Sequence, residues 1–187
     1  MPSIDIVEAD LGRIDHQQAV VDLIHAYALD PMGSGQPLPP GIRPALIPGL
    51  QQLPTTMIFL AYREGQAIGI AVCFRGFSTF AARPLINIHD LAVLPPHRGH
   101  GAGRRLLEAV ERKARELECC KITLEVGEHN HEARQIYRAA GFDQTVYSPE
   151  AGGALFMSKP LAGTADVGGV RLQPDRAANQ TRVDDCS

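Results

Sequence analysis

The chain has 187 residues, with 18 Lys and Arg against 21 Asp and Glu and a formal net charge of −3. This length suits one compact domain with an appendage, and 44% hydrophobic with 21% charged residues is typical of a globular protein. The mild acidity excludes a global basic field of the kind that binds nucleic acid. No run of 18 apolar residues is present, so we expect no membrane span.

The start of the chain and its cysteines indicate the compartment. Residues 1–5 hold no basic segment followed by an apolar stretch, so we expect no secretion signal. The four cysteines, Cys73, Cys119, Cys120 and Cys186, include no CxxC spacing. A disulfide scaffold or a zinc ribbon is therefore not expected, and a cytoplasmic location is predicted.

Apolar spacing predicts the first elements of the chain. A strand is expected over 3–8, and a helix capped by Asp15 is expected to run to about Asp30. Residues 30–41 hold four Pro and three Gly, which predicts a loop. A weaker helix is predicted over 42–53, and a hairpin of two strands over 57–62 and 67–74. A polar and aromatic connection follows over 76–83.

The second half alternates strands with amphipathic helices. Pro95 and Pro96 must end an apolar strand over 85–94, because proline donates no hydrogen bond to a sheet ladder. A long helix follows, with Leu106 and Val110 on one face. After it we expect a strand over 121–126 and a helix over 130–140 that is stopped by Gly141. A closing hairpin is expected with strands over 142–147 and 154–157.

This order of elements predicts the fold class. It indicates a mixed α/β sheet with helices on both faces. We expect one domain over residues 1–160. Residues 161–187 have no aromatic residue and no periodicity, and we interpret them as a flexible tail.

The most informative segment runs from Leu85 to Arg104, where a strand leads into a turn with three alternating glycines and then directly into a helix. Gly99, Gly101 and Gly103 let the backbone approach a ligand closely. The first N–H groups of the helix have no internal partner, and with the helix dipole they form an anion site suited to a phosphate or pyrophosphate. The segment has neither the Gly-Lys-Ser/Thr of a Walker loop nor the GxGxxG spacing of a dinucleotide-binding turn.

A second constellation lies at Asn130 and Tyr137, at the start of the next helix and two turns along it. The Asn130 amide can cap the helix or hold a ligand, and the Tyr137 phenol can donate a proton to a departing thiolate. Taken singly, both residues are explained as well by structure alone, as a helix cap and a core aromatic.

Together the two constellations resemble the GNAT superfamily of acetyl-CoA-dependent N-acetyltransferases. The family pattern Arg/Gln-x-x-Gly-x-Gly/Ala is matched at residues 98–103, and Asn-x-x-Ala-x-x-x-Tyr-x-x-x-Gly-Phe is matched at residues 130–142. Spacing and order both fit, and the resemblance covers about residues 3–158. It implies the GNAT fold, with a mixed, mostly antiparallel central sheet.

The resemblance also implies which residues hold acetyl-CoA. Backbone amides from Arg98 to Arg104 would bind the pyrophosphate, and the Arg98 and Arg104 side chains would add charge. The strand end would pair its main chain with the pantetheine arm. Asn130 would contact the donor, and Tyr137 would lie near the sulfur. The predicted donor-binding residues are Leu91, Ala92, Val93, Arg98, Gly99, His100, Gly101, Ala102, Gly103, Arg104, Asn130 and Tyr137.

The implied reaction is direct attack of an amine on the thioester, with CoA leaving as a thiolate. An alkylamine has a pKa near 10 and is mostly protonated at neutral pH, so a base is useful. His89 and Asp90 are the candidates, and His89 is preferred because an imidazole is a usable base at pH 7. Strand alternation lets only one of them face the site unless a β-bulge changes their direction.

Within the superfamily, residues 77–80 (Phe-Ser-Thr-Phe) and 88–93 look like the diamine and polyamine acetyltransferase branch. That branch often has Leu-Glu-Asp-Leu-x-Val where this chain has residues 88–93, and here His89 replaces the Glu. The change removes one attraction for a cationic substrate. Because this weakens the indication of a polyamine, we expect a small primary amine, without a narrower class, as acceptor.

Other interpretations stay open at the level of sequence. The acceptor could instead be a protein lysine or N-terminus, or the chain could be a non-catalytic CoA-binding module. A homodimer is an open alternative, and the loop at 30–41 could be a lid over the acceptor or a plain connection. His97, His100, His129 and His131 match no zinc spacing, so no metal site is predicted.

Overall fold

The computed structural model describes residues 3–144, 146–148 and 152–153. Its first half contains β1 (Ile4–Glu8), α1 (Ile14–Leu29), α2 (Ile42–Gln51), β2 (Thr56–Arg63) and β3 (Gln66–Ser78). Its second half contains β4 (Arg83–Val93), a short 3-10 turn (Pro95–His97), α3 (Ala102–Glu116), β5 (Ile122–Leu124), α4 (His131–Ala139), β6 (Val146–Ser148) and β7 (Gly152–Gly153).

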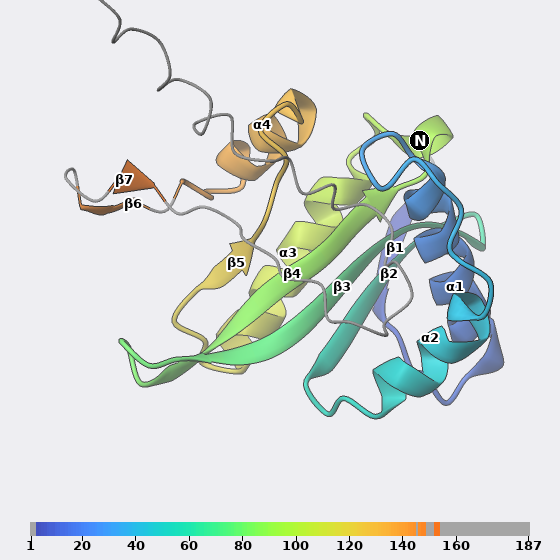
Figure 1. Ribbon diagram of the computed structural model, residues 1–187, viewed down its shortest axis with the longest axis horizontal. Coiled ribbons are helices and arrows are strands. Elements are labelled where there is room, and N and C mark those ends of the chain that lie inside the picture. The colour runs from blue at the N-terminus through green and yellow to red at the C-terminus, as the bar shows by residue number, and fades with distance from the viewer. Residues whose placement is uncertain (1–2, 145, 149–151, 154–187) are drawn as a thin grey trace, which may run out of the picture.

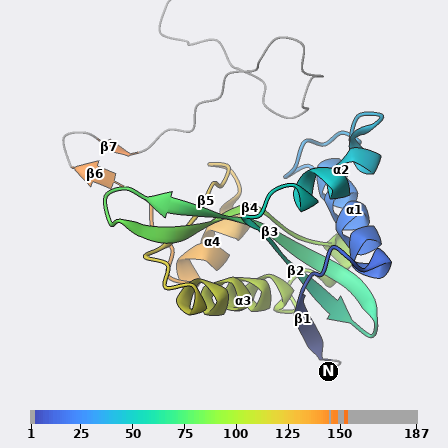
Figure 2. The same cartoon turned by 90° about the horizontal axis from the view of Figure 1, so that it is seen from below.

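One five-stranded sheet in the order β1-β2-β3-β4-β5 forms the centre of the molecule (Figure 1). β1 to β4 pair with one another in antiparallel fashion, whereas β5 is parallel to β4. The helices α1 and α2 cover one face, and α3 covers the other (Figure 2). The predicted mixed α/β sheet with helices on both faces is confirmed.

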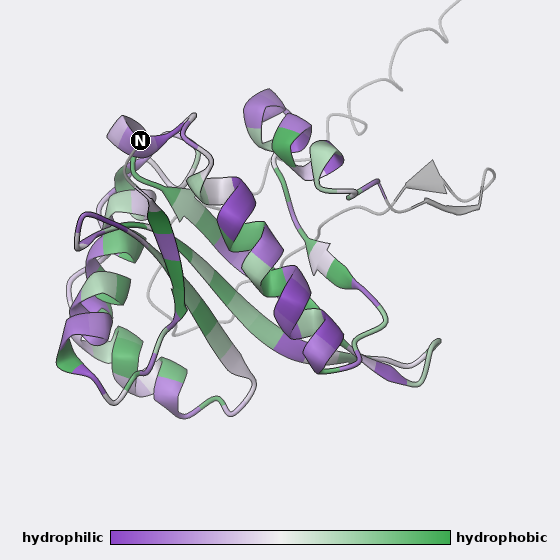
Figure 3. Ribbon diagram, turned by 180° about the vertical axis from the view of Figure 1, so that it is seen from behind, coloured by the Kyte–Doolittle hydropathy of each residue, from purple (hydrophilic) through white to green (hydrophobic). Residues whose placement is uncertain are grey.

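Each face of the sheet carries its own apolar core. Ile86, Leu106 and Val110 belong to the core under α3, and all three are fully buried. Val20, Leu60 and Ile70 belong to the core under α1 and α2. Figure 3 shows the amphipathic pattern on α3, whose outer side is largely hydrophilic while the strands behind it are hydrophobic. Burying these side chains is the main term that holds the layers together.

Several predicted boundaries were wrong. Asp15 lies in the first turn of α1 and pairs with Arg13, the actual N-cap residue, whose side chain makes no capping bond. The strands β3 and β4 extend into the stretch expected to be a connection, so their hairpin joins at 79–82. Cross-strand pairing from Cys73 to Ser78 explains this extension.

The closing hairpin also differs from the prediction. Val146 pairs with Gly153, and Ser148 pairs with Gly152, so the expected turn glycines form β7 themselves. Residues 154–157, the predicted second arm, and the predicted tail at 161–187 lie outside the described residues.

Candidate active site

A glycine turn joins the end of β4 to the start of α3. Gly99 and Gly101 have φ angles of 76° and 88°, in the left-handed region that side chains disfavour. Gly101 is the N-cap of α3. The turn is further held by His100, whose Nδ1 donates to the Arg98 carbonyl at 2.7 Å. The alternating glycines therefore let the chain reverse and enter the helix within a few residues.

The backbone N–H groups of 99–104 make no hydrogen bond to any residue that the structure describes. The first N–H groups of α3 have no partner within the helix, because no helical carbonyl precedes them by four residues. The helix dipole adds partial positive charge beside them. Arg98 differs, because its N–H donates to the Pro95 carbonyl at 3.3 Å. The free row of amides thus begins at Gly99, one residue later than the prediction.

The side chain of Arg98 is not directed to the anion site. Its Nη2 donates to Asp30 Oδ2 at 2.5 Å, and its Nε donates to the Val93 carbonyl at 2.9 Å. The expectation that Arg98 adds free charge beside the turn was wrong, because this buried carboxylate neutralises it. Arg104 remains exposed, and among the described residues its one ion pair is with Glu108, at 3.4 Å.

The last residues of β4 have a partner strand on one side only. Antiparallel pairing with β3 continues to Val93, whereas parallel pairing with β5 is confined to Ile86–Ile88 opposite Ile122–Leu124. Residues 89–93, including the predicted Leu91, Ala92 and Val93, therefore present an edge without a strand partner among the described residues. Such an edge can accept an extended ligand by main-chain pairing.

A β-bulge lies in the same strand. Val72 pairs with Asp90 and Cys73 pairs with Ile88, so His89 is the extra residue. Ile88 and Leu91 both contact the core under α3, although strict alternation would place them on opposite faces. The bulge therefore lets His89 and Asp90 share the other face, which resolves the alternative that the sequence left open.

The two candidate bases differ in environment. His89 is exposed, and its ring lies edge-on to Phe74 with 5.6 Å between centroids. Asp90 is partly buried, and this burial raises its pKa, against a lowering influence from the charge of His89. A carboxylate with a raised pKa is a stronger base than an exposed one.

Tyr27 of α1 faces the same region. Burial raises its pKa, and the negative charges of Asp90 and Asp30 raise it further. Together with Val93 and Arg98 it lines a small cavity between α1 and the end of β4. Tyr27 lies within the helix that the sequence predicts before Asp30, and no motif around it marks a functional role.

Tyr137 projects from α4 and is partly buried. Its ring lies 5.9 Å from that of Phe142 in an edge-to-face pair. Burial raises its pKa to about 12, and the nearby Tyr27 adds to this shift. Its hydroxyl has no hydrogen-bond partner among the described residues. The phenol is therefore protonated at neutral pH and free to donate a hydrogen bond.

Asn130 caps α4, because its Oδ1 accepts the Ala133 N–H at 3.1 Å. This is the structural role that the sequence offered as one alternative. Its side-chain NH₂ group remains as the polar group that a ligand could use.

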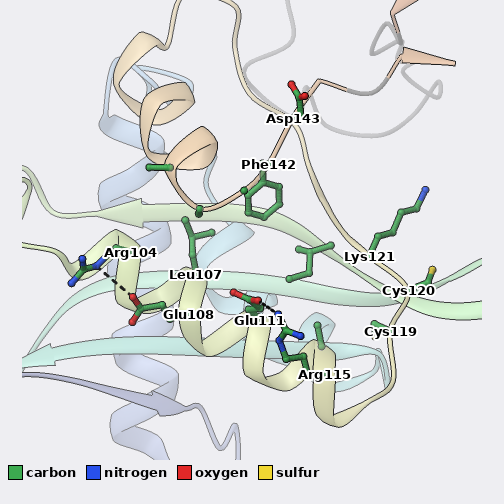
Figure 4. Close-up of a pocket in the computed structure, with 15 residues that line it drawn as sticks. Arg104, Leu107, Glu108, Glu111, Arg115, Cys119, Cys120, Lys121, Phe142 and Asp143 are labelled. Carbon is green, nitrogen blue, oxygen red and sulfur yellow. Dashed lines mark hydrogen bonds and ion pairs between the residues drawn. The ribbon is translucent and has the colours of Figure 1, made fainter. Parts of the chain in front are cut away.

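A separate groove of about 650 Å³ lies between α3, α4 and β5 (Figure 4). Two ion pairs lie on its rim, Arg104 with Glu108 and Arg115 with Glu111. Arg104 is its only lining residue that sequence analysis assigned to the site. Within 3–144, 146–148 and 152–153, no group of three or more His, Cys, Asp or Glu could hold a metal ion, and no helix is long and apolar enough to cross a membrane.

Comparison with known proteins agrees with this arrangement. A sequence model described as the Acetyltransferase (GNAT) family matches residues 23–142. An uncharacterised N-acetyltransferase of Archaeoglobus fulgidus is 35% identical over 98 residues, which cover 52% of this chain and 64% of that protein. The match thus spans less than two thirds of the relative's length.

Two further comparisons extend the range of relatives. The N-alpha-acetyltransferase 40 of Saccharomyces cerevisiae is 39% identical over 74 residues, covering 35% of this chain and 26% of that protein. The solved structure of an aminoglycoside N-acetyltransferase in complex with CoA superposes with a TM-score of 0.66 at 20% identity, covering 86% of this chain and 97% of that one. The structural likeness confirms the predicted fold.

Proposed function

Because the chain belongs to the acetyltransferase (GNAT) family, we propose that it transfers the acetyl group of acetyl-CoA to a primary amine of a small molecule. The observation that carries the proposal is the row of backbone amides at 99–104, leading into α3, which have no hydrogen-bond partner in the described part of the chain. Peptide N–H groups at a helix N-terminus suit a diphosphate, and the glycine turn leaves them accessible. The edge of β4 at 89–93, which has no strand partner on that side among the described residues, comes shortly before this row in the chain.

In this proposal the edge of β4 holds the pantetheine arm by main-chain hydrogen bonds. Main-chain N–H groups at the bulge would stabilise negative charge on the thioester oxygen as the amine attacks. The new bond joins the amine nitrogen to the acyl carbon, and the carbon–sulfur bond breaks. The amine loses one proton to a base, and CoA leaves as a thiolate.

We propose that Tyr137 stabilises the leaving sulfur by a hydrogen bond. Its pKa of about 12 exceeds that of an ordinary thiol, about 8.5, by roughly 3.5 units. Full proton transfer to the thiolate would therefore be uphill by about 5 kcal/mol at 1.36 kcal/mol per unit. A hydrogen bond formed as charge develops on sulfur avoids this penalty and still lowers the barrier.

His89 is our proposed base, and Asp90 is the alternative. Both lie on the face of β4 that the bulge turns toward α1, and His89 is the more open to solvent, into which the proton must leave. Asp90 would attract a cationic amine and could itself take the proton, because burial raises its pKa.

Among small amines, diamines and polyamines are the first class to test. The Phe-Ser-Thr-Phe sequence at 77–80 forms the end of the β3–β4 hairpin and supports this choice. The replacement of a Glu by His89 weakens it. A homodimer and a cytoplasmic location remain predictions.

A protein N-terminus or lysine is the second candidate acceptor. Its support is the likeness to N-alpha-acetyltransferase 40, which covers 35% of this chain. A screen that measures free CoA thiol against a panel of small amines and a panel of peptides would separate the two. Turnover of small amines alone supports the proposal, and turnover of peptides alone would reverse it. Binding of acetyl-CoA without any turnover would indicate a non-catalytic module.

A further inference from the structure

One ion pair connects the glycine turn to a distant part of the chain. Asp30, the C-cap of α1, lies 68 positions before Arg98, and their side chains meet at 2.5 Å. The Asp30 side chain is only 6% exposed. By contrast, the Arg13–Asp15 and Arg43–Asp22 pairs have both partners at least 44% exposed. A buried carboxylate is tolerated only when its charge is paired and hydrogen-bonded, so this pair is held in one geometry.

Arg98 uses a second donor to fix the end of β4. Its Nε reaches the Val93 carbonyl at 2.9 Å, while Nη2 holds Asp30. The Arg98 guanidinium therefore fixes Val93, the last residue of β4, relative to Arg98, the residue that leads into the glycine turn. Its planar, rigid donor geometry suits this bridging role better than a lysine would.

Asp30 also organises the loop at 30–41. Its Oδ1 accepts the Met32 N–H at 2.8 Å, and its carbonyl accepts N–H groups of Gly33 and Gly35 at 2.9 and 3.1 Å. A Cβ on Gly33 would lie 2.2 Å from the Tyr27 carbonyl, so the loop returns tightly onto the end of α1. One carboxylate thus contacts both this loop and the arginine that braces the glycine turn.

We propose that Asp30 is a positioning residue for the acetyl-CoA site, which acts through Arg98 and couples the amides of 99–104 to the loop at 30–41. The inference rests on the proposed function. Without Asp30, Arg98 loses its fixed direction, and the turn is less well organised before the donor arrives. Because the amides would bind the donor equally in the ground state and in the transition state, the loss falls on affinity for acetyl-CoA.

The test uses Asp30→Asn, which removes the charge and keeps an oxygen for the Met32 N–H. We expect the KM and the dissociation constant for acetyl-CoA to rise about tenfold, with kcat within about twofold of wild type. Asp22→Asn is the matched control, because it breaks an ion pair of 2.8 Å on the same helix. That variant should bind acetyl-CoA like the wild type.

A double-mutant cycle distinguishes action through Arg98 from general damage. If Asp30 acts through Arg98, Asp30→Asn combined with Arg98→Gln should weaken acetyl-CoA binding no more than Arg98→Gln alone. Additive losses would overturn the route through Arg98. Hydrogen exchange in the wild type needs no variant: acetyl-CoA should slow exchange of the Met32, Gly33 and Gly35 amides, and unchanged exchange would overturn the coupling.

The outcomes separate this inference from the proposed function. If the wild-type chain fails to bind acetyl-CoA in calorimetry, the proposed function falls and the inference falls with it. If the wild type binds acetyl-CoA and Asp30→Asn binds it equally well, the inference alone is wrong.

Discussion

The donor side and the acceptor side of the candidate site are built in different ways. The proposed donor side is one continuous stretch, from the edge of β4 through the glycine turn into α3, and the groups proposed to bind the donor there are main-chain amides. The acceptor side means the side chains proposed to act around the reacting atoms, and these come from separate elements: His89 and Asp90 on β4 and Tyr137 on α4, with Tyr27 of α1 beside them.

The two sides should therefore tolerate substitutions differently. Main-chain amides survive most substitutions, provided that the backbone can still adopt the turn, so the donor side depends on backbone conformation. Side-chain chemistry is lost with a single residue. We therefore expect substitutions on the acceptor side to change kcat, and substitutions on the donor side to change affinity for acetyl-CoA.

The largest effect should come from Tyr137→Phe, which removes the hydrogen bond to the leaving sulfur and keeps the ring pair with Phe142. We expect kcat to fall about 100-fold or more, with a smaller rise in KM. Steady-state kinetics against acetyl-CoA measures both constants. The control is Tyr62→Phe on β2, which should leave both unchanged. A normal kcat in Tyr137→Phe would remove the phenol from the mechanism.

The next largest effect concerns the base. His89→Gln should lower kcat/KM by about 10-fold or more and remove the acid limb of its pH profile, because that limb reports protonation of the base. Asp90→Asn is the comparison, since it neutralises the adjacent carboxylate. If the limb persists in His89→Gln and disappears in Asp90→Asn, then Asp90 is the base.

A smaller effect is expected from Gly101→Ala on the donor side. A Cβ at this position meets no atom within 4 Å, so the change acts through its φ of 88° alone. We expect a stability loss of about 1 kcal/mol and a several-fold rise in the KM for acetyl-CoA, with kcat nearly unchanged. Gly65→Ala is the matched control, because its φ is 78° and its Cβ site is equally open. If both variants lose similar stability and only Gly101→Ala raises the KM for acetyl-CoA, the result supports the donor site. The same KM for acetyl-CoA in both variants would contradict it.

The smallest effect is a gain in stability from Asp90→Asn. Burial raises the pKa of Asp90, so folding favours its protonated form, and stability is lost as pH rises from the ordinary value of about 3.8 through the raised folded value. Asp90→Asn should therefore raise Tm near pH 8 and change it little near pH 3.5. A chain of this size gains roughly 2–4 °C per kcal/mol. Thermal scans at both pH values measure the shift, and a lower Tm near pH 8 would show that the ionised carboxylate stabilises the fold.

The same contrast decides how much the sequence could predict. The glycine turn was predicted because its glycines, the prolines before it and the helix after it are contiguous and act through local conformation. The bulge at His89 could not be located from sequence, because it depends on pairing with Val72 and Cys73 on another strand.

Long-range side-chain contacts were missed for the same reason. Arg98 was predicted to supply free charge, but it pairs with Asp30 from 68 positions away. Asp30 carried no motif, and only the approach of α1 to the end of β4 gives it a role. Tyr27 is a similar case, since its position beside Asp90 exists only in the folded chain.

The most direct test of the account is a crystal structure of the chain with acetyl-CoA bound. We predict that the diphosphate oxygens lie within about 3 Å of backbone nitrogens in the range 99–104, with the pantetheine along residues 91–93 of β4. A diphosphate seated anywhere else, such as the groove between α3, α4 and β5, would contradict it.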